Sequence, residues 1–130
     1  MKKYLAVIAA CSIAATAFAS GSNELVINSY MSDQAPKEVF QKLVDDFQKK
    51  NPDIKVTVNT TAHEQFKTLL PSWLTSKQAP DVVTWFAGYR MQAFAEKGLL
   101  EPINDVFPGG SFEAEFPPAF KTASSYNGNI

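Results

Sequence analysis

From Glu24 onward, the order of apolar and polar positions alternates between the periods of strands and helices. Residues 25–27 form a short apolar run that fits a strand buried on both faces. Ile54, Val56 and Val58 alternate with polar residues and indicate a second strand. Residues 82–86 follow a proline as another apolar run and predict a third. Each predicted strand is followed by a segment of helical spacing.

The first two of these segments carry the marks of amphipathic helices. Asp33 is an N-cap candidate for the first, which ends at Asn51 and Pro52. Thr61 and Glu64 have the spacing of a capping box, which places the start of the second helix nearby. Their apolar stripes are Val39, Phe40, Leu43, Val44 and Phe47 in the first helix and Phe66, Leu69, Leu70, Trp73 and Leu74 in the second.

Proline and glycine set the remaining boundaries. Pro71 falls inside the second stripe and is expected to kink or divide that helix. Gly98 is expected to close a third helix over residues 90–97, and a short helix is expected at 119–124. Residues 107–110 and 116–118 have loop composition. Asn127 and Gly128 are a strong hairpin-turn signal with almost no strand after them, which suggests a chain that stops mid-fold.

Strand followed by helix, three times over, defines the fold class. Parallel strands need crossover helices of this length, and right-handed crossovers cover both faces of the sheet. The sequence therefore predicts an α/β lobe with a mainly parallel sheet in βαβαβα order.

The N-terminus has the pattern of an export signal. Lys2 and Lys3 precede an apolar run over residues 5–18, which is short for a membrane span. Small residues before the end of this run place cleavage between Ala19 and Ser20, so residues 1–19 are a signal peptide and residues 20–130 the mature lobe. A signal-anchor and a lipoprotein acylated at Cys11 are the alternatives. The expected location is the periplasm.

Charge and cysteine content exclude several classes of function. The chain has 12 basic and 13 acidic residues, and removing the signal leaves 10 basic ones, a net charge of about −3. Such a chain lacks the basic patch that nucleic acid requires. Without Cys11 it has no thiol and one histidine, which excludes a structural zinc site. No G-x-S-x-G elbow, P-loop or G-x-G-x-x-G is present, so neither an enzyme nor a cofactor is expected.

Ligands of open parallel sheets bind beyond the carboxyl ends of the strands. The three loops at those ends supply the ligand-binding candidates Tyr30, Asp33, His63, Glu64, Trp85, Phe86, Tyr89 and Arg90. Sugar rings pack their C–H faces on aromatic side chains, and sugar hydroxyls need polar partners, so this combination points to a carbohydrate. The competing interpretations are a core role for Trp85 or Phe86, a purely capping Asp33 and a solvated His63. Tyr89 is the expected surface aromatic.

Several segments resemble the N-terminal lobe of family 1 extracellular solute-binding proteins, the sugar receptors of ABC importers. They are the opening strand at 24–27, the step from the first helix into the second strand at 47–56, Ala79–Val83, and the helix exit at 94–103. The resemblance implies a monomeric periplasmic-binding-protein-like lobe, here without its second lobe and hinge. It also implies capture of a carbohydrate for the importer's membrane permease subunits. A secreted carbohydrate-active enzyme, a receptor for a non-sugar solute and a nonfunctional fragment remain alternatives.

Overall fold

A computed structural model describes residues 23–107, 114 and 116–130. The predicted signal peptide, the Ala19–Ser20 cleavage position and Cys11 lie outside these residues, as does most of the predicted loop at 107–110. The elements in chain order are β1 (Glu24–Ser29), α1 (Gln34–Lys50), β2 (Lys55–Thr60), α2 (His63–Thr75), β3 (Val82–Val83), α3 (Tyr89–Ala95), the 3-10 helix η1 (Asn104–Val106) and α5 (Pro118–Ala123).

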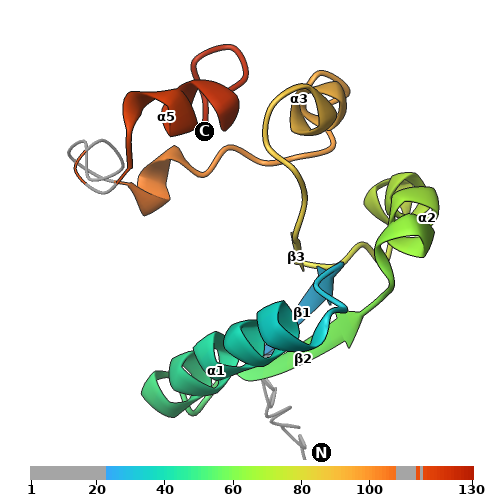
Figure 1. Cartoon of the computed structure of the whole chain (residues 1–130), viewed down its shortest axis with the longest axis vertical. Helices are drawn as coiled ribbons and strands as arrows, with labels where there is room; N and C mark the ends of the chain where they lie inside the picture. The colour runs from blue at the N-terminus through green and yellow to red at the C-terminus, as the bar shows by residue number, and fades with distance from the viewer. Residues whose placement is uncertain (1–22, 108–113, 115) are drawn as a thin grey trace, which may run out of the picture.

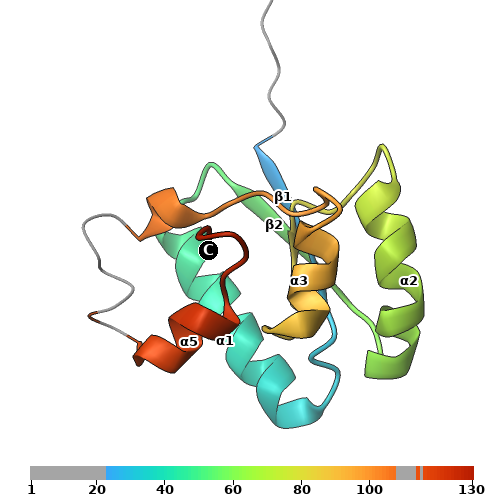
Figure 2. The ribbon, with the colours of Figure 1, turned by 90° about the horizontal axis from the view of Figure 1, so that it is seen from above.

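The three strands pair in parallel, as the strand–helix alternation predicts, and their order in the sheet is β2-β1-β3. β1 pairs with β2 over its whole length, from Glu24 opposite Lys55 to Ser29 opposite Thr60. Its other edge pairs with β3 at Ile27 and Val82. Since α1 and α2 lie on opposite sides of the strands (Figure 2), both faces of the sheet carry a helix.

The third strand is shorter than the predicted span of residues 82–86, because regular pairing ends at Val83. Thr84 still donates its backbone N–H to the carbonyl of Asn28 at 3.0 Å. Its hydroxyl then accepts a bond from the N–H of Tyr30 at 3.1 Å. Trp85 and Phe86 leave the sheet and pack on rings from other loops, so their apolar character reflects a cluster and not a strand.

The predicted capping box of α2 does not form, because the helix begins one residue late, with Ala62 at the N-cap. The N–H of Thr61 already donates to the carbonyl of Ser29 at 2.9 Å, continuing the β1–β2 ladder. Glu64 instead accepts from Lys67 at 2.9 Å. Pro71 does not divide α2, which continues to Thr75. The proline is exposed, so water can satisfy the carbonyl that loses its partner.

Burial is uneven along the predicted stripes. Among the described residues, the buried hydrophobic side chains are Ile27, Val44, Phe66 and Leu70, and those of Phe66 and Leu70 are fully enclosed. On α1 the sheet covers only part of the apolar stripe. Val39, Leu43 and Phe47 keep 58%, 63% and 40% of their surface exposed. α1 therefore presents a second apolar strip to solvent, spaced at i, i+4 and i+8, that the three-stranded sheet does not reach.

Beyond β3 the chain forms a separate group of elements, α3, η1 and α5, on the β3 side of the sheet (Figure 1). The N–H of Gly88 donates to Ala123 at 2.6 Å, which joins the start of α3 to the end of α5. α5 confirms the short helix expected near residue 119. Gly98 has the expected positive φ of 66°, although α3 ends two residues earlier than predicted, at Ala95.

The hairpin turn predicted from Asn127 and Gly128 is present. Tyr126 and Asn129 exchange backbone hydrogen bonds of 2.9 and 3.0 Å across it. Both central residues have positive φ, 49° and 82°, as a two-residue type I′ turn requires. The residue after the turn, Ile130, accepts a bond from the N–H of Ile103 at 2.7 Å and so ties the turn to η1.

Candidate functional site

The carboxyl ends of the three parallel strands meet at one edge of the sheet, and aromatic side chains from all three loops pack together there. The ring of Tyr30, after β1, stacks on Phe86, after β3, with centroids 4.9 Å apart and planes 15° apart. His63, at the start of α2, lies 5.5 Å from Tyr30 and 5.2 Å from Phe86. With Glu64, Trp85 and Arg90, these residues make up what we term the strand-end cluster.

A pair of hydroxyls fixes the backbone at the centre of the cluster. Ser29 is 1% exposed, and its hydroxyl accepts from the N–H of Met31 at 3.2 Å. Thr84 accepts from the N–H of Tyr30 at 3.1 Å and donates to Ser29 at 3.5 Å. Buried backbone groups must find partners, so these bonds hold the Tyr30 loop to the end of β3.

Phe66 supports the cluster from below, a role that the sequence did not reveal. Its side chain is fully buried and lies edge-on to Tyr30, with centroids 5.8 Å apart. The ring of Trp85 also stacks on Phe66, with centroids 5.9 Å apart and planes 19° apart. The sequence placed Phe66 in the core stripe of α2, and the only further signal was its spacing of three residues from His63.

Opposite charges border the aromatic rings. The guanidinium of Arg90 lies 4.9 Å from the centroid of Phe86, within the range of a cation–π contact. Glu64 accepts from Lys67 at 2.9 Å and lies 3.3 Å from Nδ1 of His63. The hydrogen bond and the charge of Lys67 lower the pKa of Glu64, with smaller contributions from His63 and Arg90. The cluster thus carries a carboxylate, a guanidinium and an imidazole beside stacked rings.

Two nitrogen atoms of the cluster are buried and have no hydrogen-bond partner among the described residues: Nε2 of His63 and Nε1 of Trp85. A buried polar atom without a partner costs about 1–3 kcal/mol. A hydroxyl, from water or from a ligand, would remove that cost. The cluster therefore combines flat apolar surfaces with unmet hydrogen-bonding capacity.

Two of the predicted ligand residues lie outside the strand-end cluster. Asp33 occupies the N-cap position of α1, as expected, but its side chain makes no capping hydrogen bond. Tyr89 is 84% exposed at the start of α3, in agreement with its expected surface position. Trp85 and Phe86 are both half-buried, so neither is a simple core residue. Likewise, His63 packs against rings and is not fully solvated.

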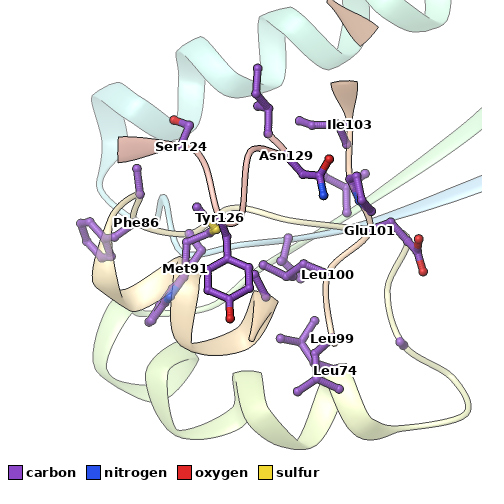
Figure 3. Close-up of a pocket in the computed structure, with 18 of the residues that line it drawn as sticks. Leu74, Phe86, Met91, Leu99, Leu100, Glu101, Ile103, Ser124, Tyr126 and Asn129 are labelled. Carbon is purple, nitrogen blue, oxygen red and sulfur yellow. The ribbon is translucent and has the colours of Figure 1, made fainter. Parts of the chain in front are cut away.

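A separate hollow of about 720 Å³ lies between β3, α3 and the C-terminal segment (Figure 3). We call it the lateral cavity. Trp85 and Phe86 contribute to its wall, but Tyr30, His63 and Arg90 do not. The rest of its lining is mostly aliphatic, including Leu74, Val83, Leu100 and Ile103. The lateral cavity and the strand-end cluster therefore share the Trp85 and Phe86 rings but differ in the rest of their residues.

Among residues 23–107 and 116–130, no three His, Cys, Asp or Glu side chains come together as a metal site would require. None of the helices described there combines the length and the hydropathy of a bilayer-spanning segment.

Comparisons with known proteins bear on the family and the fold of the chain. Residues 32–126 match the profile of the family described as bacterial extracellular solute-binding protein. An uncharacterized ABC transporter extracellular-binding protein from Pyrococcus horikoshii is 31% identical over 87 residues, which are 65% of this chain and 20% of that protein.

Two solved structures are similar in fold and sequence. The bacterial solute receptor AcbH, with an exclusive preference for β-D-galactopyranose, has a TM-score of 0.71 and 36% identity. An ABC substrate-binding protein from Listeria monocytogenes, solved with cycloalternan, has a TM-score of 0.62 and 29% identity. Each match covers 82% of this chain and 27% of the solved one. These relatives are receptors and not enzymes, and the chain spans about a quarter of their length.

Proposed function

Because the chain belongs to the bacterial extracellular solute-binding protein family, we propose that it is the N-terminal lobe of a carbohydrate receptor that serves an ABC importer. Support comes from relatives that bind sugars, AcbH and the cycloalternan-bound protein from Listeria monocytogenes. In this proposal residues 1–19 direct export and are cleaved after Ala19. Residues 20–130 then act in the periplasm as part of a monomer.

The single observation that carries the proposal is the strand-end cluster. The exposed parts of Tyr30 and Phe86 offer apolar surface for the C–H face of a pyranose. Glu64 and Arg90 supply an acceptor and a donor on the border of that surface. Nε2 of His63 and Nε1 of Trp85 are buried without a partner among the described residues, so a sugar hydroxyl would satisfy them only after the neighbouring rings move apart. Asp33, at the N-cap of α1, and Tyr89, exposed at the start of α3, complete the proposed ligand set.

The proposed mechanism is capture between two lobes. A ligand that contacts both lobes stabilises the closed arrangement only by binding it more tightly than the open one. The closed receptor then delivers the sugar to the permease subunits. This lobe provides one wall of the site, so the isolated chain is expected to bind more weakly than a two-lobed receptor.

Thermal unfolding tests the proposal with the protein in hand. A ligand of the native state raises the melting temperature according to its concentration relative to its dissociation constant. The panel contains galactose, xylose, maltose, amino acids and glycerol phosphate, each at high concentration. We expect a rise with at least one sugar. A rise with amino acids or glycerol phosphate alone would be consistent with a solute receptor and would refute a carbohydrate as its ligand.

The Arg90→Ala variant separates binding at the cluster from a general effect of sugar on stability. Excluded cosolutes such as sugars also raise melting temperatures without binding. A specific rise should therefore be lost in Arg90→Ala and retained in Lys97→Ala, which removes an exposed positive charge just after α3. Equal rises in both variants would contradict a site at the cluster.

A further inference from the structure

We infer that Asn127 is a modification site, at which the folded protein deamidates spontaneously to a mixture of aspartate and isoaspartate. The inference rests on the turn that closes the C-terminal hairpin and does not depend on the proposed function. Among the described residues, Asn127 is the non-glycine residue with a positive φ, at 49°. Its side chain is exposed.

The backbone nitrogen of the residue after Asn127 is the nucleophile of the reaction, and the turn does not engage it. Deamidation begins when the backbone nitrogen of the next residue attacks the side-chain carbonyl carbon. That nitrogen belongs to Gly128, and its N–H is absent from the hydrogen bonds of the described turn, which join Tyr126 to Asn129. A Cβ built on Gly128 would meet no atom within 4 Å, so the approach is not crowded by neighbouring groups. Glycine itself adds no side chain beside the nitrogen.

The chemistry needs only water. The nitrogen of Gly128 forms a bond to Cγ of Asn127 as the bond from Cγ to Nδ2 breaks. The proton from the attacking nitrogen leaves with the amide as ammonia. Water then opens the five-membered succinimide. Opening at Cγ gives aspartate, and opening at the main-chain carbonyl gives isoaspartate, with the chain continuing through the former side chain.

The turn is held weakly enough for the required rotation. A positive-φ conformation does not itself bring the Gly128 nitrogen to Cγ, so the turn must open first. Within the described residues, the pair Tyr126 and Asn129 closes it as an isolated bridge outside the named strands. Such short, exposed hydrogen-bonded segments open locally at little cost in free energy.

The product alters the wall of the lateral cavity. Asn127 lines that cavity together with Tyr126 and Asn129, both of which are labelled in Figure 3. Isoaspartate lengthens the main chain by one carbon within a two-residue turn, so the paired bonds between Tyr126 and Asn129 cannot both persist. It also places a negative charge on the rim. The bond from Ile103 to Ile130 lies directly beyond the turn and should weaken with it.

Peptide mapping by mass spectrometry tests the inference on the purified full chain, incubated at mildly alkaline pH and 37 °C. We expect Asn127 to gain the mass of an amide-to-acid conversion before any other asparagine, with isoaspartate detected by a methyltransferase specific for it. Asn129, in the same hairpin but followed by the bulky Ile130, is the internal control. Earlier conversion of Asn129, or an intact Asn127 after the denatured chain has converted, would overturn the inference.

Two variants connect the modification to the structure. Asn127→Gly keeps a turn sequence that favours positive φ and removes the amide. Asn127→Asp introduces the charge without the extra backbone atom. After ageing, amide hydrogen exchange at Tyr126 and Ile103 should be faster in the original chain and unchanged in Asn127→Gly. If fresh Asn127→Asp already shows the same loss of protection, charge and not chain lengthening opens the turn.

Discussion

Tyr30 and Phe86, separated by 56 positions in the sequence, stack with their ring centroids 4.9 Å apart. The parallel pairing of β1 with β3 makes this contact possible, because both loops leave the sheet at the same edge. The hydroxyls of Ser29 and Thr84 hold the two loops together beneath the rings. One geometric relationship thus serves both the stability of the lobe and the proposed sugar surface.

Phe86→Ala should destabilise the lobe, because it removes the ring that stacks on Tyr30, contacts His63 and lies beneath Arg90. We expect a loss of about 2 kcal/mol in the free energy of unfolding, below the roughly 3–5 kcal/mol of a fully buried ring. Tyr89→Ala, at an 84% exposed aromatic, should change it by less than about 0.5 kcal/mol. Urea denaturation followed by circular dichroism measures both, and equal losses would contradict the assigned packing.

Asp81→Ala should weaken the attachment of β3. The carboxylate of Asp81 accepts from the N–H of Val26 at 2.8 Å, and its own N–H donates to the carbonyl of Val26 at 3.0 Å. Losing the side-chain acceptor at this partly solvated position should cost about 1 kcal/mol. Asp53→Ala removes the same charge from an exposed turn and should have little effect. If the two variants unfold at the same urea concentration, the Asp81 bond makes no net contribution.

Glu24 should make the stability of the β1–β2 pair depend on pH. Its hydrogen bond from Lys55, then that from Thr57 and the charge of Lys55, lower its pKa below 4.5. A depressed pKa in the folded state contributes stability above the unfolded pKa, and that contribution disappears as the pH falls through the folded pKa. The difference between the original chain and Glu24→Gln should therefore be present at pH 7 and be lost at an acidic pH below the depressed pKa of Glu24 in the folded state.

Denaturation curves at both pH values measure this difference. Glu96→Gln, at the end of α3, removes the same charge away from the sheet and is the matched control. A difference between the original chain and Glu24→Gln that grows as the pH is lowered would have the wrong sign for a depressed pKa.

How far the sequence predicts this structure depends on whether local or distant groups decide each feature. The strands at β1 and β2, the limits of α1 and the turn at Asn127 follow from local periodicity and backbone preference, and all are present. The capping box at Thr61 fails because a distant carbonyl, that of Ser29, takes its N–H. The third strand was predicted too long because Trp85 and Phe86 are apolar residues that pack on rings of other loops and do not pair in the sheet.

The candidate site shows the same division. The rule that ligands bind at the carboxyl ends of parallel strands selected the loops that carry Tyr30, His63 and Phe86, and the structure brings those rings together. The supporting roles of Phe66 and Thr84 depend on contacts between elements, which periodicity does not encode. Ligand binding at these residues stays a prediction.

The exposed strip on α1 predicts self-association of the purified chain. Val39, Leu43 and Phe47 present adjacent apolar surface, and burying such surface is favourable by about 25 cal/mol per Å². Leu43→Glu should therefore reduce light scattering at high protein concentration. Gln65→Glu adds the same charge to an exposed position of α2 as the control. Equal scattering from both variants would show that net charge, and not the α1 strip, governs association.

Tryptophan fluorescence addresses the strand-end cluster most directly. Trp73→Phe leaves Trp85, which lies 6.3 Å from Tyr30 and 5.5 Å from Phe86, as the sole indole. Titrating this variant with sugars and with amino acids then reports on binding near Trp85. Because Trp85 also lines the lateral cavity and Arg90 does not, an Arg90 substitution distinguishes the two places. The account predicts a saturable change in Trp85 emission with a sugar, abolished by a further Arg90→Ala substitution. A saturable change with an amino acid and none with any sugar would contradict it.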